Sequence, residues 1–166
     1  MEKLRKRSEV NKEDCWDLTL MVKDQAEYEE KKNLILQYNQ KIVAMKGHIL
    51  DSKDTLKEFL EVSERESRLL EQLYIYVRLT YDEDTSNATS LARKLEMEQL
   101  VNTCEDAESF ITSEFMKRDY EDILPWLEED DFLKDYKLYF KRVYRQKERI
   151  LSEKEERIIT KGEYGL

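Results

Sequence analysis

Residues 53–81 read KDTLKEFLEVSERESRLLEQLYIYVRLTY, and their apolar side chains return every three or four positions. This spacing gathers them on one face of an α-helix, because a helix completes a turn in about 3.6 residues. A helix of about 27 residues would span about 40 Å at about 1.5 Å per residue. The segment therefore predicts a long amphipathic helix over 53–80. Its apolar face consists of Leu56, Phe59, Leu60, Ser63, Leu70, Leu73, Tyr74, Val77 and Tyr81.

A second long helix is predicted over 25–46, ahead of this segment. Asp24 and Glu27 have the spacing of a capping box, in which a side-chain acceptor is followed three residues later by an acid. Gly47 is a natural stop, since glycine adopts the left-handed conformation that commonly ends a helix. The apolar stripe between these two signals consists of Tyr28, Ile35, Tyr38, Ile42, Met45 and, beyond the stop, Ile49.

A third long helix is predicted over 85–115. The stretch DEDTSN at 82–87 separates it from the preceding helix, since these residues favour caps and turns over helix interiors. Its apolar residues form two patches rotated slightly from each other, which indicates different neighbours at its two ends. Pro125 then predicts a broken segment, because proline lacks the N–H that a helix interior needs. The two patches are Ala88, Leu91, Ala92 and Leu95, then Leu100, Cys104, Ala107, Ile111 and Phe115.

A fourth helix is predicted after Asp130 and Asp131. Acids lie ahead of it and bases crowd its end, which complements the helix dipole. Ser152 and Glu155 repeat the capping-box spacing and predict a short further helix that Gly162 ends.

The whole chain favours an all-α fold. It has 166 residues but only 3 Gly and 1 Pro, too few for a sheet with many tight turns. We predict an elongated bundle of four or five antiparallel helices. Residues 1–23 form an N-terminal arm, residues 24–160 a single helical domain and residues 161–166 a C-terminal tail.

Charge and composition exclude several partners. The net charge of −9 disfavours nucleic acid, because a negative surface repels phosphate. No uncharged stretch approaches the roughly 18 residues of a membrane helix, and no signal peptide is recognisable, which predicts a cytoplasmic protein without a membrane partner. Cys15 and Cys104 are far apart in the chain and are expected to be free thiols in that reducing compartment.

Catalytic motifs are missing from the sequence. It has 1 His, so the two histidines of HExxH cannot both be present, and no glycine-rich phosphate loop occurs. The acids of DEDTSN lack the glycine and the distal glutamate of a calcium loop. We therefore predict that this chain alone is not an enzyme and has no catalytic residue, no metal ligand and no cofactor.

The last predicted long helix carries the candidate interaction residues. Its aromatic stripe is larger than one helix face usually hides in a small bundle, so we expect part of it to contact a partner or a second copy. A basic face there suits an acidic partner surface; the alternative is a solvated helix end that complements the dipole. The aromatic candidates are Phe132, Tyr136, Tyr139, Phe140 and Tyr144, and the basic candidates are Lys141, Arg142, Arg145, Lys147 and Arg149.

Three stretches together resemble one family. They are Trp16-Asp17-Leu18 within CWDLTLMVKDQAEYE, LYIYVRLTYDEDTSN over 73–87 and YKLYFKRVYRQKERILSEKEERII over 136–159. Their order and spacing resemble the N-terminal helical region of oligoendopeptidase F, one of the thimet oligopeptidase-like zinc metallopeptidases. The resemblance covers residues 14–159. Arg149 departs from it, since relatives often have histidine shortly before the LSxxEE stretch.

The resemblance implies a noncatalytic lid that controls peptide access. Family members are several times longer, and two histidines and a glutamate of their downstream catalytic domain bind the zinc. None of those ligands has a counterpart here, so zinc would belong to a catalytic domain joined in cis or in trans. Short peptides would bind only to the complete enzyme. The alternative is a free-standing acidic helical module for protein interaction or self-association.

Overall fold

The computed structural model describes residues 9–147, and within that range all regular structure is helical. The all-α fold is therefore confirmed. Two short 3-10 helices, Lys12–Asp14 and Leu18–Leu20, precede the α-helices. The α-helices are α1 (Gln25–Ala44), α2 (Lys53–Glu83), α3 (Ala88–Glu108), α4 (Ile111–Phe115), α5 (Tyr120–Glu129), α6 (Asp131–Lys134) and α7 (Lys137–Lys147).

The described residues divide into two compact units. Unit 1 comprises 9–46 and 58–109, and unit 2 comprises 47–57 and 110–147. The single helical domain over 24–160 stays a prediction. The short helix expected after Ser152 and the tail at 161–166 lie outside the described residues.

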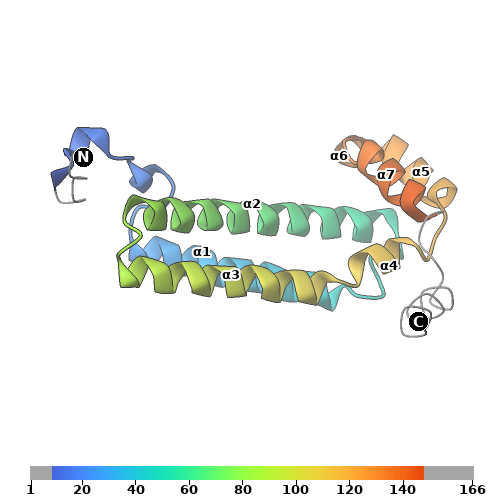
Figure 1. The fold of residues 1–166 in the computed structure, drawn as a ribbon. Helices are drawn as coiled ribbons and strands as arrows, with labels where there is room; N and C mark the ends of the chain where they lie inside the picture. Colours follow the sequence, from blue (N-terminus) through green and yellow to red (C-terminus); the bar gives the residue numbers. More distant parts are fainter. Residues whose placement is uncertain (1–8, 148–166) are drawn as a thin grey trace, which may run out of the picture. The chain divides into compact units, whose positions relative to one another are not determined.

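Unit 1 is a three-helix arrangement of α1, α2 and α3, which run side by side in Figure 1. Near the start of α1, Gln25 accepts a hydrogen bond from Arg93 of α3 at 2.6 Å. Near its end, Asn39 donates to Glu108 of α3 at 2.7 Å, so α1 and α3 run parallel. The helix that follows α1 in the chain, α2, runs antiparallel to both. One apolar cluster joins all three helices, and it contains Val22, Tyr28, Ile35, Leu73, Val77, Met97 and Cys104.

The predicted helix boundaries of unit 1 follow their capping signals. Asp24 accepts the backbone N–H of Glu27 at 3.0 Å, while the Glu27 carboxylate accepts the N–H of Lys23 at 2.7 Å. Asn87 caps α3 by accepting from the N–H of Thr89 at 2.9 Å. After α1 ends at Ala44, Gly47 adopts a φ of +90°, which side-chain-bearing residues rarely reach.

The third predicted helix is wrong in its length, because α3 ends at Glu108 instead of continuing to 115. The Ser109 N–H bonds to the Asp106 carbonyl three residues back, which tightens the last turn, and α4 begins separately at Ile111. The first predicted apolar patch is not fully covered either. Leu91 and Leu95 are 40% and 56% exposed.

Pro125 does not break its segment. It lies inside α5, between the buried residues Ile123 and Leu127. The carbonyl that loses its helical partner is that of Glu121, four residues earlier, and Glu121 is exposed, so this carbonyl can bond to water. Burial of the two flanking apolar side chains outweighs the loss of one hydrogen bond.

Unit 2 has a core of its own. Glu114 is only 3% exposed and accepts the backbone N–H groups of Gly47 at 2.7 Å and Ile49 at 2.9 Å, which holds the α1–α2 connection against α4. Lys57 forms an ion pair of 2.8 Å with Asp130, the residue that caps α6, and lowers the pKa of that carboxyl. The buried apolar residues of unit 2 are Ile49, Leu50, Leu56, Phe115, Ile123, Leu127, Leu133, Phe140 and Tyr144.

Candidate functional site

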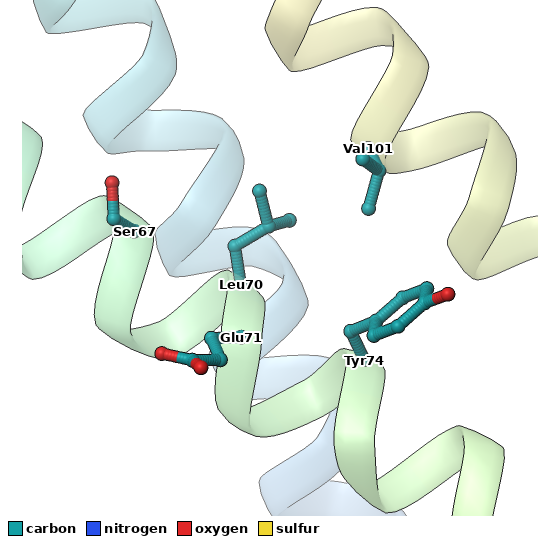
Figure 2. Close-up of a pocket in the computed structure, with 5 residues that line it drawn as sticks. All are labelled: Ser67, Leu70, Glu71, Tyr74 and Val101. Atoms are coloured by element: carbon teal, nitrogen blue, oxygen red, sulfur yellow. The ribbon is translucent and has the colours of Figure 1, made fainter.

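A small apolar pocket opens between α2 and α3 of unit 1. It has a volume of about 240 Å³ and is lined by Ser67, Leu70, Glu71, Tyr74 and Val101. Figure 2 shows Leu70 and Tyr74 directed from α2 toward Val101 on α3, with the Glu71 carboxylate to the side of this apolar group. These three apolar residues pack against the buried cluster beneath them, so the floor of the pocket is held by the core.

The pocket is smaller than a site for a whole cofactor. Pockets that bury complete small molecules measure roughly 300–1,000 Å³. A volume of about 240 Å³ suits one side chain of a larger ligand.

An acidic side chain, Glu71, borders this pocket, and the basic side chain nearest to it on α2 already has a partner. Arg68 is paired with Glu64, and Lys94 lies 3.5 Å from Glu98 and over the ring of Tyr81. Glu71 is exposed at the pocket edge, and it has no ion-pair partner among residues 9–147. Arg68, three residues before Glu71 on α2, is therefore already paired, while Glu71 remains available.

A layer of buried polar side chains crosses the interior of unit 1. Glu66 of α2 is 2% exposed, and one of its carboxylate oxygens has no hydrogen-bond partner within the described part of the chain. Cys104 of α3 lies beside Glu66. Glu108, also of α3, accepts from the Asn39 amide of α1 at 2.7 Å. All three helices thus contribute to one polar layer.

Burial raises the pKa of each ionisable group in this layer. Desolvation, reinforced by the negative charge of Glu108, raises the pKa of Glu66 to about 7. Desolvation also raises the pKa of Glu108, and the Asn39 hydrogen bond partly opposes that rise. The pKa of Cys104 rises to about 12, first through burial and then through the charge of Glu66, so its thiol is a poor nucleophile near neutral pH.

The predicted aromatic candidates come together in unit 2, but two of them belong to its core. Phe140 is 0% and Tyr144 8% exposed, and Phe140 packs edge-on against Phe115 with ring centroids 5.1 Å apart. The Tyr144 hydroxyl donates to the Phe115 carbonyl at 2.6 Å. Since both are buried in unit 2, contact with a partner stays a prediction for the exposed part of the stripe alone.

The exposed part of the predicted surface is narrower. Tyr139 is 47% exposed, and its neighbour Leu138, which is not among the predicted candidates, is 58% exposed. Phe132 and Tyr136 are half-buried and stack on each other with ring centroids 5.2 Å apart.

The predicted bases lie on the same helix, α7. Lys141, Arg142 and Arg145 are exposed and have no acidic partner within residues 9–147. The Lys147 side chain and all of Arg149 lie outside the described part of the chain. The outer surface of α7 thus combines Leu138 and Tyr139 with three available bases; we call these five residues the α7 surface.

The described residues do not fit a zinc site. No group of three or more His, Cys, Asp and Glu side chains among them could hold a metal ion. His48 is exposed, and its Nδ1 lies 2.7 Å from a carboxylate oxygen of Asp51 three residues later. Within the same residues, no helix is long and apolar enough to span a membrane. Both cysteines are free, with Cys104 buried.

Comparison with known proteins gives consistent sequence matches. A family model described as oligopeptidase F matches residues 114–162. The chain is 30% identical over 156 residues to an oligoendopeptidase F homologue from Lactococcus lactis subsp. lactis, which covers 93% of this chain and 26% of the relative. It is 28% identical to the homologue from Borreliella burgdorferi, with 92% of this chain and 26% of that relative aligned.

Solved structures share the fold. The crystal structure of a protein from Chlamydophila abortus, assigned as a peptidase, aligns with a TM-score of 0.80 at 22% identity, over 96% of this chain and 27% of that chain. Oligoendopeptidase F from Enterococcus faecium aligns with a TM-score of 0.67 at 21% identity, over 82% of this chain and 27% of that chain.

In sequence this chain is similar to part of oligoendopeptidase F proteins, and the two solved structures share its helical fold. This similarity confirms the resemblance to the N-terminal helical region of oligoendopeptidase F that the sequence predicts. The chain spans about a quarter of the length of the curated relatives it matches.

Proposed function

We propose that this chain is a noncatalytic substrate-access region of an oligoendopeptidase F-like protein, one that shapes which peptides reach a catalytic part. The main support is the coverage of the match, since 93% of this chain aligns with only 26% of the Lactococcus lactis relative. The catalytic part would be joined in cis or in trans. It would carry the zinc, and this chain would supply no ligand to it.

Peptide cleavage by the purified chain tests the noncatalytic half of this proposal. With added zinc, we expect no cleavage of a quenched fluorescent peptide mixture above a blank, because the described residues contain no metal-ligand cluster. A complete oligoendopeptidase F serves as the positive control. Zinc-dependent cleavage that copurifies with the chain, and that disappears on chelation and returns with zinc, would contradict the proposal.

A second candidate function is protein interaction or self-association through the α7 surface. Leu138 at 58% and Tyr139 at 47% exposure lie on one helix with Lys141, Arg142 and Arg145. Large exposed apolar side chains bordered by charges are typical of contact surfaces. An acidic surface on the catalytic part or on a second copy would complement these bases.

Self-association can be measured by sedimentation velocity across a concentration series. If α7 joins copies, Leu138→Glu/Tyr139→Glu will shift the sedimenting species to the monomer, because two carboxylates replace the exposed apolar contact. Glu121→Gln, also at an exposed position of unit 2, is the control and should leave the distribution unchanged. If the unsubstituted chain stays monomeric at every concentration, self-association through the α7 surface is excluded.

A further inference from the structure

We propose that the α2–α3 pocket binds one apolar side chain of a peptide whose neighbouring residue is basic. The inference rests on the proposed function, because peptides are the ligands that a substrate-access region would meet. It adds a binding site and a preferred chemistry.

The apolar half of the preference follows from the lining. Leu70, Tyr74 and Val101 form the floor, and Figure 2 shows all three directed into the same space. Each is only partly buried and packs on the cluster beneath it, so an incoming apolar side chain would remove further apolar surface from water without rearranging the core. The volume of about 240 Å³ accepts one such side chain.

The basic half follows from charge complementarity. Glu71 lies at the edge of the pocket and is exposed. The base nearest to Glu71 in the helical register, Arg68, is already paired with Glu64. Glu105 lies one turn beyond Val101 on α3 and is also exposed, so the edge attracts a cation. A peptide with an acid at this place would be repelled.

The test uses the full chain and a blocked hexapeptide with leucine-arginine at its centre and glycine elsewhere. Binding is followed by the NMR shifts of the Leu70 and Val101 methyl groups. We expect saturable shifts with a dissociation constant in roughly the millimolar range, since one side chain and one exposed ion pair contribute. Replacing the peptide leucine by glycine should weaken binding about tenfold, and replacing its arginine by glutamate about two- to fivefold.

A charge exchange gives the decisive comparison. Glu71→Lys should reverse the preference, so that the leucine-glutamate peptide binds more tightly than the leucine-arginine peptide. Glu58→Lys makes the same change at another exposed position of α2, about 20 Å away at about 1.5 Å per residue, and should keep the original preference.

The outcomes separate this inference from the proposed function. Shifts that do not saturate, or a preference that Glu71→Lys leaves unchanged, would overturn the pocket assignment while the access role could still hold. Reversal of the preference would support the pocket even if this chain proved unable to act with any catalytic part.

Discussion

The effect of Glu66→Gln on the free energy of unfolding is expected to depend on pH. Between about pH 5 and about pH 8 this effect should become more favourable by about 2–3 kcal/mol. Glu66 has a pKa of about 7 in the folded chain, well above the ordinary value of 4.5, chiefly because it is desolvated. The folded state therefore keeps the proton longer than the unfolded state. The stability linked to this proton is complete below about pH 4.5 and is lost as the pH rises through about 7.

Urea unfolding followed by far-UV circular dichroism at several pH values measures this effect. Glutamine matches the shape of the protonated acid and cannot ionise, so the parent and Glu66→Gln should diverge as the pH rises. Glu58→Gln, an exposed position on the same helix, is the control for removing one charge.

The pH dependence of unfolding distinguishes two outcomes for the polar layer around Glu66. A steeper loss of stability with pH in the parent than in Glu66→Gln supports a buried, proton-holding carboxyl. Glu108→Gln should also reduce the slope, because the charge of Glu108 is the second cause of the raised pKa of Glu66. If the free energies of unfolding of the parent and of Glu66→Gln change equally with pH, the Glu66 carboxyl does not keep its proton in the folded state.

Glu114→Ala is expected to lower the free energy of unfolding by about 3 kcal/mol or more. The change removes the acceptor for the Gly47 and Ile49 N–H groups, which bond to the carboxylate at 2.7 and 2.9 Å. The N–H of Ile49 would stay buried without a partner, and such a group costs about 1–3 kcal/mol. A cavity left by the deleted side chain adds to the loss.

Glu114→Gln separates the two contributions. The amide keeps the volume and one acceptor oxygen, but its NH₂ group would face the second N–H donor, so a loss of about 1–2 kcal/mol is expected. Thr112→Ala, at an exposed position of the same short helix, should change stability by less than about 0.5 kcal/mol. Urea midpoints of the three variants provide the comparison. Equal midpoints for Glu114→Ala and Thr112→Ala would contradict the role of Glu114.

The sequence predicted the long helices well because their signals are local. Three- and four-residue spacing and capping side chains depend only on near neighbours, and Asp24 and Asn87 cap α1 and α3 in the structure. The end of α3 was missed because the apolar stripe continues through Ser109, where the backbone tightens.

The buried polar side chains were harder to foresee. Glu66 falls in register with the apolar face of α2, three residues after Ser63 and four before Leu70. Asn39 falls in register with the apolar stripe of α1, four residues after Ile35 and three before Ile42. The register was thus a usable signal that these polar groups lie inside. Their pairing partners depend on which helices meet, and spacing within one helix does not contain that information.

The aromatic stripe is the opposite case, because side chains selected as a partner surface include two that are buried. Helical spacing placed Phe140 and Tyr144 on one face with Tyr139, but spacing cannot tell a face that covers the core of unit 2 from one that meets a partner. The Phe115 carbonyl that receives the Tyr144 hydroxyl comes from 29 residues earlier, so only the tertiary fold shows that this face is covered.

The access role is tested most directly by exchanging this region in a complete relative. In the Lactococcus lactis oligoendopeptidase F homologue, the segment matched by this chain would be replaced with it, and cleavage of peptides of graded length and sequence would be compared with the parent enzyme. Zinc content and circular dichroism would verify that the chimera is folded and loaded. We expect kcat for the shortest peptide to stay within a few-fold of the parent enzyme's value while the preference among longer peptides changes. A folded, zinc-loaded chimera that loses cleavage of the shortest peptide, or that keeps the parent's preferences throughout, would contradict it.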